Sequence, residues 1–196
     1  MILPKERDPR LITVRRGGSL TDSDHRLLAL WAAACAEHVL PLFEAVQPDD
    51  ARPREAIEMA RAWARGGVPM MEARAFAGHA NAAARELRGA ARFAAYACAQ
   101  AVAVAHVAAH DLGAAAYAIR ARGSSTLSAQ RSDRQSQLET VVRVTNDMQE
   151  ATAGDAERAM RLECEWQRAQ LPREIRDLVL EDQGARNAIC WGVFNT

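Results

Sequence analysis

Apolar residues recur at intervals of three and four along most of this chain, the spacing that places them on one face of an α-helix. Trp31, Trp63 and Trp166 fall on such apolar stripes, so we expect all three in the core. No stretch alternates with a period of two for long enough to require a sheet, and the short segment "LITVRR" has no partner strand. The pattern predicts an all-α fold, a compact bundle of about seven helices.

Capping residues and helix breakers predict several helix boundaries. Thr21 precedes Asp24 by three residues, as in a capping box, so a helix should begin there. Pro41 should end or kink that helix. We also expect a helix break at Gly113, within the stretch that carries two histidines.

Alanine dominates the middle of the chain, up to residue 118. It has the highest helix propensity, and its small side chain lets helix axes approach closely. Two helices, over 69–88 and from about residue 90, should therefore form a tight antiparallel hairpin at the centre of the bundle.

The length of 196 residues suits one domain, which can bury a sizeable core without disulfides or metals. We expect a single helical domain over residues 1–196 with two less regular parts. Residues 1–20 mix charges with prolines and should form an extended N-terminal arm. Residues 122–136, "RGSSTLSAQRSDRQS", are polar and rich in serine, and should form a mobile loop.

Charge and cysteine content limit the function classes. Lys and Arg number 25, and Asp and Glu also number 25, so the neutral chain is not expected to bind nucleic acid in general. Polar residues such as Gln100 and Asp111 interrupt the most alanine-rich stretch, so we expect no membrane span. The cysteines are widely spaced and no secretory signal is recognisable, which predicts a cytoplasmic protein.

Histidines are the candidate metal ligands. His106 and His110 are four residues apart and would share one helical face, and His79 could join them only through the tertiary fold. No HExxH or ExxH pair accompanies them. We interpret them as hydrogen-bonded residues between helices and predict no metal and no cofactor. The alternative is a pocket of His38, His79, His106 and His110 that binds a metal or small ligand and performs hydrolysis.

Nucleophilic catalysis has little support in the sequence. Cys35 and His38 are three residues apart, but both fall on the apolar face that carries Trp31. The "RRGGS" segment near Arg15 lacks the strand, helix and lysine context of a phosphate-binding loop. We predict no catalytic residue and expect a binding protein more than an enzyme.

The loop "QPDDARP" is the candidate for contact with another protein. Its residues Asp49, Asp50 and Arg52 are charged and should be exposed. Helix capping would explain the two aspartates equally well.

Four segments together carry a resemblance to a known family: "RDPRLITVRRGGSLTDSDHRLLALWAAACAEHVLPLFE", "DDARPREAIEMARAWARG", "AVAVAHVAAHDLGAAAYAI" and "LPREIRDLVLEDQGARNAICWGVF". In this order they resemble the immunity protein five-like family of bacterial toxin–immunity systems. The resemblance implies a non-catalytic binding module that neutralises a cognate toxin protein by occupying its active site or an adjacent surface. The resemblance implies no catalytic residue in this chain. A structural role as a homodimer is a further alternative.

Overall fold

The structure, a computed structural model, describes residues 3–138 and 147–195, with the backbone alone for 130–138 and 147–152. Its described residues form seven α-helices of more than two turns and one short one, with no strands, which confirms the predicted all-α bundle. The helices are α1 (Asp22–Val39), α2 (Pro41–Glu44), α3 (Arg52–Ala64), α4 (Met70–Ala83), α5 (Gly89–Ala103), α6 (Asp111–Leu138), α7 (Asp147–Ala169) and α8 (Arg176–Arg186).

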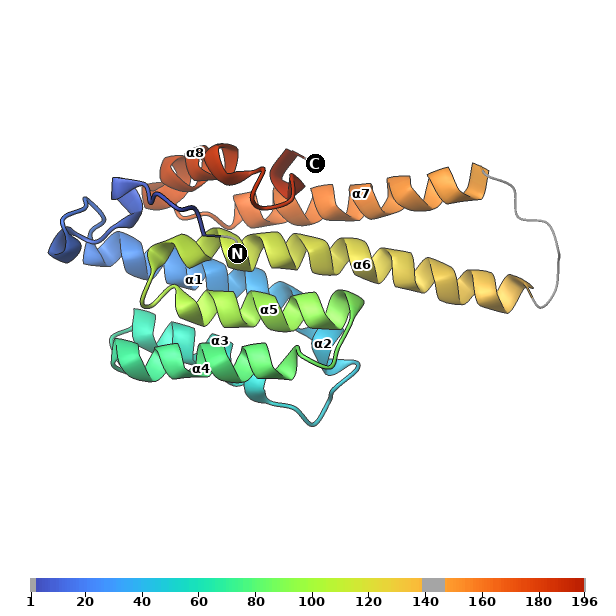
Figure 1. The fold of residues 1–196 in the computed structure, drawn as a ribbon, viewed down its shortest axis with the longest axis horizontal. Coiled ribbons are helices and arrows are strands. Elements are labelled where there is room, and N and C mark those ends of the chain that lie inside the picture. The colour runs from blue at the N-terminus through green and yellow to red at the C-terminus, as the bar shows by residue number, and fades with distance from the viewer. Residues whose placement is uncertain (1–2, 139–146, 196) are drawn as a thin grey trace.

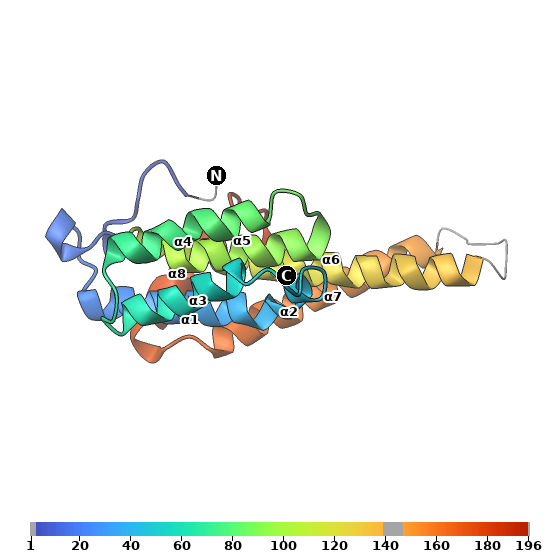
Figure 2. The ribbon, with the colours of Figure 1, turned by 90° about the horizontal axis from the view of Figure 1, so that it is seen from below.

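The helices pack in layers around α5 and α6 (Figure 1). α3 and α4 lie on one side of this pair, α7 and α8 lie on the other, and α1 packs against both α5 and α6. α6 and α7 run antiparallel and extend together beyond the rest of the molecule (Figures 1 and 2).

The predicted boundaries of the first helix are confirmed. The Thr21 side chain accepts a hydrogen bond from the Asp24 backbone N–H at 3.0 Å, which satisfies a free donor of the first turn. α1 ends at Val39, and Pro41 starts α2. By length and composition alone, one stretch among the described residues, Asp22–Glu44, could cross a membrane, and 56% of its apolar window is buried inside the bundle.

The alanine-rich hairpin forms as predicted, from α4 and α5. Gly113, however, lies inside α6 and does not break it, so that expectation is wrong. A Cβ at Gly113 would lie 2.5 Å from Oε1 of Gln100. The glycine therefore serves close packing of α6 against α5, and not a turn.

Residues 122–136 are helical and belong to α6, which corrects the predicted loop. Ser and Thr are tolerated there because their hydroxyls bond back to the preceding turn. Thr126 donates to the Arg122 carbonyl at 3.2 Å, and Ser128 donates to the Ser124 carbonyl at 2.9 Å. Gly123 allows α7 to come close, since a Cβ there would lie 2.8 Å from Met160.

The N-terminal arm folds back on the end of the bundle. Leu11 and Leu20 are buried, and Thr13 pairs with Leu20 in an isolated bridge. A Cβ at Gly18 would lie 2.1 Å from the Ile12 carbonyl oxygen, so this fold requires glycine. The predicted extended arm is thus a compact segment with two 3-10 turns, Pro9–Leu11 and Val14–Arg16.

The three tryptophans differ in burial. Trp31 is buried as predicted, and its indole N–H donates to the Gln167 carbonyl at 2.9 Å. Trp63 and Trp166 are only half-buried, which corrects their expected place in the core. In α7 the apolar stripe does not face inward: Leu162 is 54% exposed, because Gln167 and its neighbours face α6 instead.

Candidate functional site

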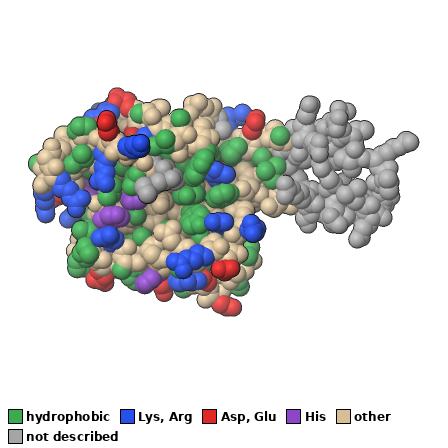
Figure 3. Space-filling view, in the orientation of Figure 1, with side chains coloured by type: hydrophobic (Ala, Val, Ile, Leu, Met, Phe, Trp, Pro, Cys, Tyr) green, Lys and Arg blue, Asp and Glu red, His purple; other side chains and the backbone are tan. Residues whose placement is uncertain are grey.

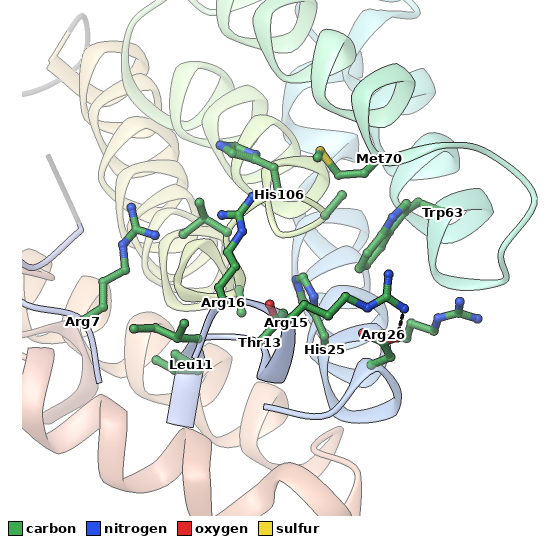
Figure 4. A pocket seen from close by; sticks show the side chains of 15 residues that line it. Arg7, Leu11, Thr13, Arg15, Arg16, His25, Arg26, Trp63, Met70 and His106 are labelled. Carbon is green, nitrogen blue, oxygen red and sulfur yellow. Dashed lines mark hydrogen bonds and ion pairs between the residues drawn. The ribbon is translucent and has the colours of Figure 1, made fainter. Parts of the chain in front are cut away.

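A cavity of about 340 Å³ opens where the N-terminal arm meets α1, α3 and the turn between α5 and α6 (Figure 4). We call it the arginine cavity. Its rim carries Arg7, Arg15, Arg16 and Arg26, and its wall includes Leu11, Thr13, His25, Trp63, Met70, His106 and Val107.

Positive charge dominates the arginine cavity. Asp22 is the one carboxylate among its lining residues, and it pairs with Arg15 at 2.6 Å. Within the described part of the chain, no ion pair is found for Arg7, Arg16 or Arg26. The cavity therefore carries more guanidinium groups than carboxylates to balance them.

His25, which the sequence analysis did not single out, forms part of the cavity wall. It is buried, its Nε2 donates to the Val104 carbonyl at 2.7 Å, and its ring meets Trp63 edge to face with centroids 4.8 Å apart. Burial lowers the pKa of His25, which favours the neutral imidazole. The cavity thus owes its charge to arginine alone.

His106 and His110 do not share a continuous helix, which corrects the predicted arrangement. α5 ends at Ala103, a 3-10 turn follows at Ala108–His110, and α6 begins at Asp111. The two rings still lie close, with centroids 5.2 Å apart. The helix can be interrupted there because side chains of distant helices donate hydrogen bonds to its free carbonyl groups. His25 donates to the Val104 carbonyl, and Arg186 donates to the Ala109 carbonyl.

These two histidines have different surroundings. His110 donates from Nδ1 to Gln100 at 2.7 Å, as the sequence interpretation expected of a residue between helices. Burial, together with the neighbouring His106, lowers the pKa of His110 to about 4. Nδ1 of His106 is shielded from solvent and has no hydrogen-bond partner among the described residues. Burial also lowers the pKa of His106, and Arg74 adds to this effect.

The four histidines of the hydrolase hypothesis do not form one site. His79 is exposed on α4, where it contacts Phe76, and His38 lies in a separate cavity with Trp166. Among the described residues, no group of three or more His, Cys, Asp or Glu could hold a metal ion. Burial raises the pKa of the Cys35 thiol well above its usual value, so a thiolate beside His38 is disfavoured.

His38 belongs to a polar network that joins α1, α6 and α7. Its Nδ1 lies 2.9 Å from the buried carboxylate of Glu163, which also accepts from Arg122 at 3.1 Å and from Gln167 at 3.1 Å. The His38 ring stacks on Trp166 with centroids 3.7 Å apart. Since Glu163 is fully engaged, this network supports packing of the three helices.

A third feature is a half-exposed surface of aromatic and arginine side chains, which the sequence analysis missed. Its members come from α5, α6 and the segment after α8. We call it the aromatic–arginine surface, and it comprises Arg92, Phe93, Tyr96, Tyr117, Arg120 and Trp191, around a hollow of about 300 Å³. The spacing of Arg92 and Tyr96, four apart on one helix, was a signal for it.

The rings of this surface pack on one another. Tyr117 lies 5.2 Å from Tyr96 and 5.1 Å from Trp191 between ring centroids. The guanidinium of Arg120 lies 4.7 Å from the Phe93 ring and 4.5 Å from the Trp191 ring, and Arg92 donates to the Tyr96 hydroxyl at 3.1 Å. On the side of the molecule drawn in Figure 3, hydrophobic side chains gather near the middle with Lys and Arg side chains around them.

Trp191 has a left-handed backbone with φ of 60°, and its side chain is 44% exposed. A positive φ is unusual for a bulky residue and costs free energy, so the surrounding packing must hold it. Gly192 follows with φ of 71°, and its N–H bonds to the Asn187 carbonyl. The C-terminal turn thus holds an indole ring at the surface against Tyr117.

Of the residues predicted to contact a partner, Asp49 and Asp50 lie in the connection before α3, and Arg52 is the first residue of α3. Asp49 and Arg52 are exposed, whereas Asp50 is half-buried. Arg52 donates to both carboxylate oxygens of Asp50, at 2.8 and 2.6 Å. This pairing leaves Asp49 as the more available carboxylate, and a role in partner binding stays a prediction.

Comparisons with known proteins identify the family. The chain matches neither a curated protein nor a solved structure. The model of one family, described as Imm-5 like putative immunity protein, matches residues 18–144, which leaves α7, α8 and Trp191 outside the match. Because this match covers more than half of the chain, the protein belongs to the Imm-5 like immunity protein family.

Proposed function

We propose that this protein neutralises a cognate toxin by binding to it, without catalysing a reaction. The observation that carries the proposal is the aromatic–arginine surface. The few residues that dominate the binding energy of protein interfaces are enriched in Trp, Tyr and Arg. Here they are gathered on one face of a chain that is only 5% aromatic and has two tyrosines, both in this surface.

The packing of the surface suits tight binding. Each ring contacts another ring or a guanidinium, so the side chains lose little conformational freedom when a partner docks. Trp191, the most exposed ring of this surface, would serve as the central anchor. Family membership supports a toxin as the partner. We further propose that the protein acts in the cytoplasm.

The charge of the surface favours a carboxylate-bearing face of the toxin. Arg88 lines the same hollow as Arg92, and no carboxylate is among the described residues that line it. An acidic partner would pair with these guanidinium groups, which adds specificity and speeds association. A homodimer would instead bring like charges together, so we favour a heterologous partner.

The test is co-expression with the toxic domain encoded beside the gene of this protein. The protein should restore growth and should co-purify with that domain in a fixed ratio. The double variant Arg92→Glu/Arg120→Glu should lose binding by about 100-fold or more, because both contacts change from attraction to repulsion. Arg85→Glu, at an exposed residue outside the surface, is the matched control and should bind as the wild type does.

The sequence-based alternative is tested in the same assay. If the 45–51 connection carries the contact, Asp49→Lys/Asp50→Lys should weaken binding and Arg92→Glu/Arg120→Glu should not. If growth is not restored and no complex survives gel filtration, toxin neutralisation is wrong for that pair.

A further inference from the structure

The "RRGG" segment has no role in the proposed toxin contact, yet backbone hydrogen bonds to the Thr13 and Val14 carbonyls hold its conformation. Val14–Arg16 form a 3-10 turn that Gly17 ends in the left-handed region, with φ of 84°. Gly18 follows, where the close Ile12 carbonyl excludes any side chain. These two glycines hold Arg15 and Arg16 at the mouth of the arginine cavity.

The rim of this cavity has the chemistry of an anion site. Arg16 reaches toward His106 on one side, and Arg15 and Arg26 lie together on the other, below Trp63 (Figure 4). The like charges of Arg15 and Arg26, which lie together, repel one another, and Asp22 balances only Arg15. A bound anion would relieve that repulsion, and guanidinium groups bind phosphate oxygens through paired hydrogen bonds.

The wall of the cavity is apolar and suits a ring. Trp63 and Met70 form its upper side in Figure 4, and Leu11 lies across from them. The Trp63 indole is held in place by its edge-to-face contact with His25. Aromatic side chains bind the faces of nucleic-acid bases by stacking. The volume of about 340 Å³ lies at the small end of ligand pockets, which suits a single nucleotide unit.

We propose that the arginine cavity binds a small aromatic phosphate ester, of the size of a nucleoside monophosphate. Arg26, which lies below Trp63, holds the phosphate at the mouth, Arg16 attracts it from the opposite side, and Trp63 stacks on the base. The neutral imidazole of His25 supports the indole and adds no charge. The site lies apart from the aromatic–arginine surface and shares no lining residue with it, so the proposal stands independently of toxin binding.

The test is isothermal titration calorimetry of the full chain with AMP at low salt. AMP should bind at one site per chain, and Arg16→Gln and Arg26→Gln should each weaken it by about tenfold. Neither arginine has an ion pair within the described chain, so the fold should be retained, which the thermal midpoint checks. Arg85→Gln is the matched control, because it removes an exposed arginine elsewhere and should leave affinity unchanged.

Further measurements distinguish a nucleotide from other phosphate-containing ligands and test the role of the Trp63 ring. Trp63→Leu should weaken the binding of AMP and leave the binding of inorganic phosphate unchanged. No binding of AMP, equal loss in Arg85→Gln, or inorganic phosphate binding as tightly as AMP would overturn the proposal. Binding to vesicles that contain phosphatidic acid, without binding of AMP, would overturn it in favour of a lipid headgroup.

Discussion

The guanidinium of Arg120 lies 4.5 Å from the centre of the Trp191 ring and joins α6 to the C-terminal turn. Because Trp191 is 44% exposed, truncating it removes less buried area than truncating the core residue Trp31 would. Trp191→Ala should therefore cost less than about 1.5 kcal/mol of folding stability but about 2 kcal/mol or more of toxin affinity. Urea unfolding and calorimetry on the same preparation measure the two quantities. A loss of stability without a loss of affinity would make Trp191 a packing residue only.

Trp31 and Trp166 should differ in their contributions to stability. Trp31 is buried and bonded to Gln167, so Trp31→Ala should lower the free energy of unfolding by about 3 to 5 kcal/mol. Trp166 is half-exposed and stacks on His38, so Trp166→Ala should cost less than half of that. Chemical denaturation of both variants gives the comparison, and equal losses would contradict the burial described for Trp166.

Gly113 should resist substitution although it lies in a helix. Gly113→Ala would force Gln100 to move, and Gln100 is bonded to His110. We expect a loss of about 1 to 3 kcal/mol from overpacking. Gly184→Ala is the matched control, because nothing lies within 4 Å of its Cβ position in α8, and it should stabilise by about 0.5 to 1 kcal/mol. Thermal unfolding of the two variants tests whether their changes in stability have opposite signs.

Asp111 should make the protein less stable as the pH rises. Burial raises the pKa of Asp111 from 3.8 to about 7, and Arg186, which binds both Asp111 and Asp182, only partly opposes the shift. Between these pH values the unfolded chain binds fewer protons than the folded chain, so this group's contribution to the free energy of unfolding falls as the pH rises and is constant above about 7.

The measurement compares the wild type with Asp111→Asn in urea between about pH 4 and pH 8. The comparison is needed because His110, whose pKa burial lowers to about 4, contributes the opposite slope below its unfolded pKa. The difference between the two proteins should change through this range and level off above about pH 7. A constant difference would show that Asp111 is ionised throughout in the folded state.

The sequence by itself determined the features that depend on neighbours within a turn. Thr21 caps α1 and Pro41 ends it because each acts on backbone groups a few residues away. The periodic apolar residues predicted a helical bundle, and the alanines predicted the α4–α5 hairpin. These inferences needed no knowledge of what lies across the bundle.

Tertiary structure alone decided the features that depend on contacts between distant segments. Gly113 and Gly123 look like helix breakers in sequence, but they stay helical because Gln100 and Met160 pack against them. The helix ends instead at Ala103, and side chains from other helices donate hydrogen bonds to the free carbonyl groups that follow. The arginine cavity likewise exists only because the N-terminal arm folds back onto the bundle. In each case the contact energy between segments far apart in sequence outweighs local helix propensity, and no local sequence pattern indicates which segments will be in contact.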